Sequence, residues 1–195
     1  MSKPFFITGL PRSRTAWLAL AATTDRSICF HEPLARMQEW QDVSHLWAND
    51  VYEFVGVSDS GLGFHIDHIL ETSAPRTLIV ERPVGEVTAS LRAIGIDNPS
   101  YCKALAEYIE RVRPHPLVRY VGFSDLADIK VVAECLRWLM PGLGVDMNKL
   151  EELSRLNVQA DMGLVWKQVE ARKKDFAPLA GVEVANYLKT LPVGA

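Results

Sequence analysis

Residues 5–20 read FFITGLPRSRTAWLAL, and this stretch decides the fold class. An apolar run ends at a Gly-Leu-Pro sequence, which is typical of a buried strand followed by a turn. Ser13 suits the N-cap or the first turn of a helix that we expect to run to about Thr24. The stretch therefore predicts a strand, a loop with two arginines, and a helix whose amino end faces that loop.

The rest of the chain repeats this alternation of short apolar runs and helical patterns. Further strands are expected at residues 27–30, 76–81 and 117–122. Helices are expected at residues 33–50, 66–72, 84–95, 100–113, 127–144, 147–156 and about 164–175. The poorly patterned residues 51–63 predict a loop with at most one helical turn. Such alternation indicates an α/β fold in three layers, with a parallel sheet of about four to five strands and helices on both faces.

Length and composition favour an ordinary globular protein. The chain has 195 residues, a formal net charge of -3 and 48% hydrophobic residues, so we expect one domain over residues 1–195. The slightly acidic balance argues against a nucleic-acid partner. Three widely spaced cysteines, Cys29, Cys102 and Cys135, form no CxxC motif and favour reduced thiols and a cytoplasmic location.

The amino-terminal apolar stretch is interrupted by Pro11, Arg12 and Arg14, which a secretory signal peptide does not tolerate. The chain also has no run of about 18 apolar residues, so we expect no membrane span.

The loop after the first strand has the chemistry of an anion site. The first N–H groups of a helix lack partners, and the helix dipole adds positive charge there. Arg12 and Arg14 add forked cationic donors, while Ser13 and Thr15 add hydroxyls. The alternative is that the arginines are solvated and Ser13 only caps the helix. The triphosphatase motif GxxxxGK[ST] is not matched, because Arg14 stands at its second glycine and Thr15 at its lysine.

A second candidate phosphate site lies in residues 78–91, LIVERPVGEVTASL. Arg82 stands at the end of an expected strand, and Ser90 follows eight positions later on the expected helix. Both side chains can reach one phosphate if the chain turns at Pro83. Taken singly, Arg82 reads as a surface arginine and Ser90 as an ordinary helical serine.

Together with residues 118–144, these motifs resemble the P-loop-like sulfotransferases that use 3′-phosphoadenylyl sulfate (PAPS), over residues 4–35 and 76–145. The resemblance implies that one loop binds the 5′-phosphosulfate, with Ala16 replacing a hydroxyl residue. That loop consists of Pro11, Arg12, Ser13, Arg14, Thr15, Ala16 and Trp17. Arg82 and Ser90 would bind the 3′-phosphate. The implied product is adenosine 3′,5′-bisphosphate, and the family chemistry needs no metal.

Sulfuryl transfer needs a base for the acceptor and a cation for the leaving oxygen. Arg12 suits the second role, and its help is electrostatic because a guanidinium stays protonated. For the base, Glu32 in CFHEPL resembles the Glu-Pro of carbohydrate sulfotransferases; His31 is the second choice and His65 the third. We expect the strand before Glu32 to lie beside the first strand, so that its side chain points into the cleft above Ser13. The alternative is that Glu32 caps the helix that begins at Pro33.

The late basic run at residues 171–175, ARKKD, resembles a family loop that contacts the 3′-phosphate, although a charged helix face also explains it.

The leading hypothesis is a transferase that moves a sulfuryl group from PAPS to a hydroxyl or amine of a small-molecule or carbohydrate acceptor. A nucleotide-binding protein without transferase activity and a small phosphoryl-transfer kinase are the alternatives. The missing GK[ST] argues against the kinase. The acceptor and the oligomeric state stay open.

Overall fold

The core of the molecule is a five-stranded sheet in which every strand pair is parallel. The computed structural model describes residues 2–36, 43–48 and 50–155. The strand order is β2-β3-β1-β4-β5. The strands are β1 (Lys3–Gly9), β2 (Ser27–His31), β3 (Phe54–Ser58), β4 (Arg76–Glu81) and β5 (Val118–Gly122). The predicted α/β fold with a parallel sheet is therefore confirmed.

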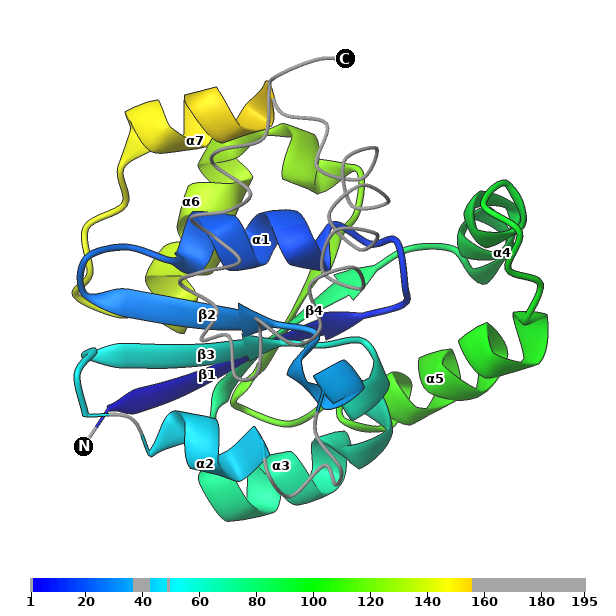
Figure 1. Cartoon of the computed structure of the whole chain (residues 1–195), viewed down its shortest axis with the longest axis horizontal. Helices are drawn as coiled ribbons and strands as arrows, with labels where there is room; N and C mark the ends of the chain where they lie inside the picture. The colour runs from blue at the N-terminus through cyan, green and yellow to red at the C-terminus, as the bar shows by residue number, and fades with distance from the viewer. Residues whose placement is uncertain (1, 37–42, 49, 156–195) are drawn as a thin grey trace.

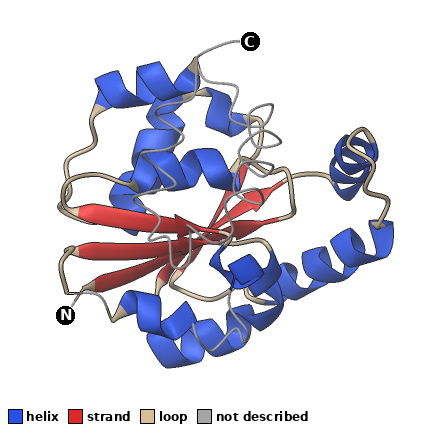
Figure 2. Ribbon diagram, viewed as in Figure 1, coloured by secondary structure: helices blue, strands red, loops and turns tan. Residues whose placement is uncertain are grey.

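Helices cover both faces of this sheet (Figures 1 and 2). One face carries α1 (Thr15–Ala22), α6 (Ile129–Leu139) and α7 (Met147–Ser154). The other face carries α2 (Ser44–Trp47), α3 (Ile66–Ser73), α4 (Val84–Arg92) and α5 (Pro99–Arg111). Three short 3₁₀ turns, η1 (Pro33–Arg36), η3 (Gly61–His65) and η4 (Asp125–Ala127), follow β2, β3 and β5.

The strands are apolar on both sides because both faces of the sheet are buried. In β1, Phe5 and Ile7 pack against the α1 side, whereas Phe6 between them packs against the α5 side. Both neighbours of β1 hold it in register, with Ile7 opposite Ser58 of β3 and Leu78 of β4. The loop after β1 consequently leaves the sheet at its centre, where successive connections depart in opposite directions and ligands of such sheets usually bind.

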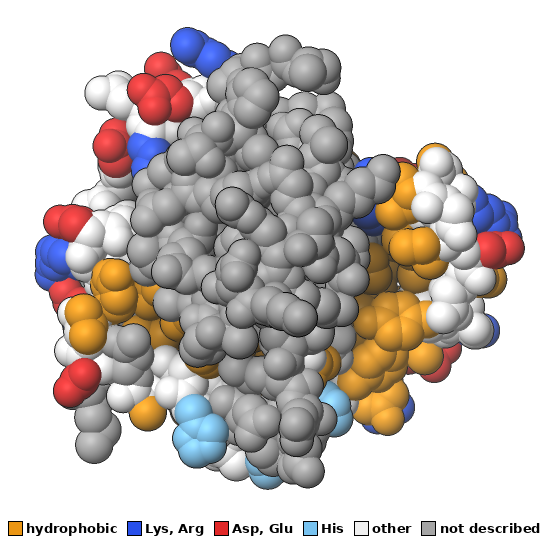
Figure 3. Space-filling model, in the orientation of Figure 1, with side chains coloured by type: hydrophobic (Ala, Val, Ile, Leu, Met, Phe, Trp, Pro, Cys, Tyr) orange, Lys and Arg blue, Asp and Glu red, His pale blue; other side chains and the backbone are white. Residues whose placement is uncertain are grey.

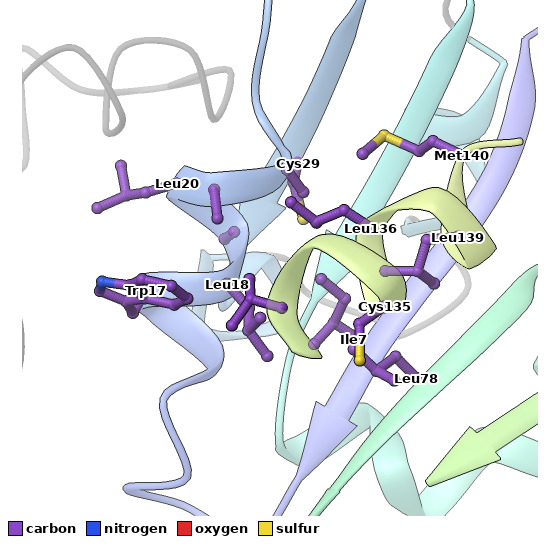
Figure 4. Close-up of a cluster of buried hydrophobic side chains, with 14 of the residues drawn as sticks. Ile7, Trp17, Leu18, Leu20, Cys29, Leu78, Cys135, Leu136, Leu139 and Met140 are labelled. Carbon is purple, nitrogen blue, oxygen red and sulfur yellow. The ribbon is translucent and has the colours of Figure 1, made fainter. Parts of the chain in front are cut away.

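The cluster on the α1 side packs α1 against α6 (Figure 4), and α7 adds Leu150 and Leu153 to it. The indole Nε1 of Trp17 donates to the carbonyl of Leu153 at 2.8 Å. The ammonium of Lys149 on α7 donates to the carbonyl of Leu20 at 2.9 Å and contacts the Thr23 carbonyl, both at the carboxyl end of α1. These contacts tie α1 to α7 both near its amino end, at Trp17, and at its carboxyl end.

Three sequence-based expectations about elements are wrong. Residues 54–58 form strand β3, not a loop, and Gly56 weakened its apolar pattern: a Cβ there would lie 2.0 Å from Cε2 of Phe5. Residues 33–50 do not form one helix, because a 3₁₀ turn ends at Arg36 and α2 begins only at Ser44. Arg14, and not Ser13, is the N-cap residue of α1.

The expected helix at residues 164–175, including the basic run at 171–175, lies outside the described residues. Of the described helices, none is long and apolar enough to cross a membrane. The three cysteines are buried and unpaired.

Figure 3 shows hydrophobic side chains gathered beside α4 and α5. Ile94 and Ile96, which follow α4, are 53% and 48% exposed.

Candidate functional site

The loop between β1 and α1 has an unusual backbone. Arg12 and Arg14 both adopt the left-handed region, with φ of 66° and 60°. Non-glycine residues there cost on the order of 1–3 kcal/mol each and cluster at active sites and ligand-binding segments. Arg14 is the N-cap of α1, and its side chain makes no capping hydrogen bond. The loop thus leaves the first N–H groups of α1 without the usual side-chain acceptor.

Ser13 between them has a buried hydroxyl whose partner is not supplied by the described residues. Its side chain is fully buried, and Oγ makes no hydrogen bond with any described group. A buried polar atom left unsatisfied costs about 1–3 kcal/mol. An oxygen-rich anion seated on the loop would supply the partner, so the loop fits a phosphate or sulfate group.

The structure brings the two predicted phosphate motifs into direct contact. Nε of Arg12 donates to Oγ of Ser90 at 3.2 Å. The guanidinium of Arg82 donates through Nη1 to the carbonyl of Arg12 at 2.6 Å. The hydroxyl of Ser90 still carries its own proton to donate. These two contacts tie the β1 loop to the end of β4 and to α4.

The ring of Phe123, which follows β5, lies close to the guanidinium groups of two arginines at this site. The Cζ atom of Arg82 lies 4.1 Å from the centre of its ring, and that of Arg14 lies 5.1 Å away. The negative face of an aromatic ring attracts cations. The ring therefore keeps two positive charges close together beside the loop, although they repel each other.

A cavity of about 450 Å³ opens next to the loop, a size that suits a small-molecule site. One wall comes from the loop and α1, with Arg12, Arg14 and Trp17. The other lining residues come from the segments after β2 and β3 and from α5. The lining residues are Pro11, Arg12, Arg14, Thr15, Ala16, Trp17, His31, Glu32, Leu34, Asp59, Ser60, Gly61 and Tyr101. The cavity lining thus combines the cationic side chains of the loop with the acidic side chains of Glu32 and Asp59.

Glu32 reaches this cavity although its strand is not where the sequence placed it. We expected β2 beside β1, but β3 lies between them. Because all strands are parallel, β2 still ends at the same edge as the loop. Ser60 donates to Oε1 of Glu32 through its N–H at 3.3 Å and its hydroxyl at 3.2 Å. Burial raises the pKa of Glu32, although 32% of its side-chain surface stays exposed.

The alternative helix-capping role of Glu32 is taken by another residue. The N–H of Leu34 in the 3₁₀ turn donates to Oδ2 of Asp59 at 2.9 Å. Glu32 itself has φ of 46°, and its backbone N–H donates to the carbonyl of Ser58 at 2.8 Å. The carboxylate of Glu32 is therefore turned toward Ser60. Nε2 of His31 lies 3.9 Å from Oε1 of Glu32.

Sequence reasoning missed Asp59, Ser60 and Tyr101. Asp59 is fully buried, and its Oδ1 accepts from the N–H of Leu62 at 3.1 Å. Burial, and next the charge of Glu32, raise the pKa of Asp59 to about 7. Burial likewise raises the pKa of Tyr101 to about 12. The β-branched residues before Ser-Asp-Ser at 58–60 are the signal that could have indicated a strand with polar residues at its end.

The remaining candidate base lies elsewhere. His65, at the end of η3, does not line the cavity, and burial lowers its pKa. Within residues 2–36, 43–48 and 50–155, no three His, Cys, Asp or Glu side chains are grouped as metal ligands would be.

Comparison with known proteins supports the fold. No family model matches this chain, and no curated protein matches its sequence. Among solved structures, the crystal structure of a sulfotransferase from Alicyclobacillus acidocaldarius matches with a TM-score of 0.52 and 15% sequence identity. The match covers 75% of this chain and 85% of that one. At this identity the likeness concerns the fold, and the chain accordingly has an α/β fold similar to that of a bacterial sulfotransferase.

Proposed function

We propose that this protein is a sulfotransferase that moves a sulfuryl group from PAPS to a hydroxyl or amine of a small-molecule or carbohydrate acceptor. The observation that carries the proposal is the β1 loop. It places a buried hydroxyl without a described partner between two left-handed arginines, at the amino end of α1. The fold shared with a bacterial sulfotransferase supports the same assignment.

The loop would hold the 5′-phosphosulfate end of the donor. Ser13 and the first N–H groups of α1 supply hydrogen bonds, and Arg12 and Arg14 supply positive charge. When the sulfuryl group leaves, negative charge grows on the bridging oxygen that remains with the nucleotide. Arg12 stabilises that charge electrostatically without giving up a proton.

Arg82 and Ser90 would hold the 3′-phosphate of the same nucleotide. Arg82 is stacked on Phe123 and tied to the Arg12 carbonyl, so its guanidinium is fixed before the ligand arrives. A cation held in place loses little side-chain freedom on binding. The contact between Arg12 and Ser90 means that the two phosphate sites adjoin each other.

The acidic wall of the cavity would take the acceptor. As the acceptor oxygen or nitrogen bonds to sulfur, the sulfur–oxygen bond to the nucleotide breaks, and the acceptor loses a proton. Glu32 lines the same cavity as the loop and can accept that proton. The apolar side chains of Trp17 and Leu34 would contact the body of the acceptor.

Calorimetry with adenosine 3′,5′-bisphosphate in the presence of a chelator tests the nucleotide assignment. Arg12→Ala and Arg82→Ala should each weaken binding by about ten- to a hundredfold, because a charge-assisted hydrogen bond contributes about 1.5–3 kcal/mol. Arg137→Ala on the exposed side of α6 removes the same charge and should leave affinity unchanged. If neither site variant weakens binding, the assignment of both phosphate sites is refuted.

Transfer itself is tested by incubating the protein with PAPS and pooled hydroxyl and amine acceptors, and detecting sulfated products by mass. Binding of the bisphosphate without any sulfated product would favour a nucleotide-binding protein that lacks transferase activity. ATP binding that requires Mg²⁺ would favour a kinase.

A further inference from the structure

Glu32 and Asp59 are brought together by the register of two neighbouring strands. Strands β2 and β3 pair so that His31 lies opposite Ser58. This register places the next residues along both strands, Glu32 and Asp59, side by side. Each carboxyl group accepts a backbone N–H from the other group's segment, Asp59 from Leu34 and Glu32 from Ser60, which holds the two groups beside each other. Both residues line the cavity.

Two carboxyl groups held this close can share a hydrogen bond only if one of them carries a proton, because an ionised carboxylate can only accept. The hydrogen bonds that the two side chains make with other groups all come from donors. Asp59 accepts from the N–H groups of Leu34 and Leu62, and Glu32 accepts from the N–H and hydroxyl of Ser60. A protonated carboxyl group still accepts hydrogen bonds, so one proton between Glu32 and Asp59 is compatible with every one of these contacts.

We propose that Glu32 and Asp59 hold one proton between them at neutral pH, and that Asp59 is a positioning residue that sets the pH at which Glu32 takes the acceptor's proton. The proposal rests on the proposed function only for the source of that proton. The other ionisable groups on the cavity wall are His31 of β2, Tyr101 of α5, and Arg12 and Arg14 of the loop.

Electrostatics favour the shared proton. Two carboxylates in contact resist double ionisation, so the second proton leaves the pair only at a raised pH. Burial adds to this effect, while His31 opposes it by lowering the pKa of Asp59. The reactive form is the doubly ionised pair: it takes one proton from the acceptor, becomes singly protonated, and releases that proton to solvent. A base that titrates near neutral pH is better matched to this task than an ordinary carboxylate.

Carbon-13 NMR of the full chain, with labelled Asp and Glu side-chain carboxyls, tests the pair directly between about pH 4 and pH 9. The wild type should show a carboxyl transition near neutral pH. Glu32→Gln should move it to lower pH by about 1 unit or more, because the like charge is gone. Asp59→Asn should abolish it. The control Glu71→Gln makes the same chemical change on exposed α3 and should leave it unmoved.

The titration decides the proposal even if one variant fails to fold. A wild type without any carboxyl transition above about pH 6 would overturn it, as would a transition that Glu32→Gln leaves in place. Adenosine 3′,5′-bisphosphate binding is measured separately on the same samples. A chain that titrates as expected but does not bind the nucleotide keeps the carboxyl pair and loses the sulfotransferase assignment.

Discussion

Ser13 gives the sharpest test at the scale of single residues. It is either an anion ligand or a structural residue, and the two roles predict opposite changes in the free energy of unfolding when Ser13 is replaced by alanine. In the ligand-free protein its buried hydroxyl lacks a partner among the described residues, so Ser13→Ala should raise the free energy of unfolding or leave it unchanged. The same change should weaken adenosine 3′,5′-bisphosphate binding by about tenfold or more, since a hydrogen bond to a charged group contributes about 1.5–3 kcal/mol. Urea unfolding and calorimetry measure the two effects. Lower stability with unchanged affinity would make Ser13 a structural residue.

Glu32→Gln separates a base from a merely polar wall residue. Glutamine keeps the size and can still accept from Ser60 through its amide oxygen, but it takes no proton at neutral pH. We expect turnover with PAPS and a responsive acceptor to fall about 10²–10⁴-fold, with nucleotide affinity nearly intact. His31→Gln is the matched comparison. If His31→Gln alone abolishes transfer, the base is His31.

Helix α3 shows how one backbone angle at an element's end affects stability. Its C-cap residue Ala74 adopts the left-handed conformation, with φ of 44° and ψ of 44°. This conformation costs an L-residue roughly 1–2 kcal/mol, and glycine avoids most of that cost while losing more entropy on folding. Ala74→Gly should therefore raise the free energy of unfolding by about 0.5–1 kcal/mol.

The C-cap of α4 provides the control for this prediction. Ala93 occupies the same kind of position with φ of -61°, which suits alanine. Ala93→Gly should destabilise the protein by up to about 1 kcal/mol in the same urea titration. Equal effects of the two substitutions would show that the left-handed conformation of Ala74 costs nothing.

Strand β3 depends on the absence of a side chain at Gly56. A Cβ there would lie 2.0 Å from Cε2 and 2.1 Å from Cζ of Phe5, whose ring fills the space beside the strand. Gly56→Ala should destabilise the protein by about 1–3 kcal/mol or more through overpacking. Gly144→Ala, which has no atom within 4 Å of its new Cβ, should have a small effect. The penalty should shrink in a Phe5→Leu background, and an undiminished penalty would point away from the ring contact.

The ionisation of Asp59 should make the free energy of unfolding of the whole protein depend on pH. Its pKa rises from an ordinary value of 3.8 to about 7 on folding. Between these values the folded state holds a proton that the unfolded state has released, so the free energy of unfolding falls as the pH rises from about 4 to about 7. Below and above this window Asp59 contributes no slope.

Asp59→Asn removes this contribution. The free energy of unfolding of the wild type minus that of the variant should therefore fall as the pH rises across the window. Urea titrations at several pH values measure it. Asp67→Asn on the exposed part of α3 serves as the control. A difference that stays constant from about pH 4 to pH 7 would contradict the raised pKa of Asp59.

Local patterns within the sequence were enough to predict the fold class and the loop with Arg12, Ser13 and Arg14. A buried parallel strand is a short apolar run, and a phosphate loop is a contiguous segment, so neither requires knowledge of distant neighbours. The same holds for Arg82 and Ser90, which share one strand-to-helix connection. The predicted roles of these residues stay predictions until the nucleotide is tested.

The acidic side of the cavity was decided only by the tertiary structure. Glu32 and Asp59 are 27 positions apart in the chain, and they meet because β2 and β3 pair in one particular register. Gly56 concealed β3 from pattern analysis, since the space its side chain would fill belongs to Phe5 of another strand. Strand order, register and burial arise from contacts between distant segments, and burial is the largest cause of the raised pKa of Asp59. Such properties belong to the folded chain and have no local signature.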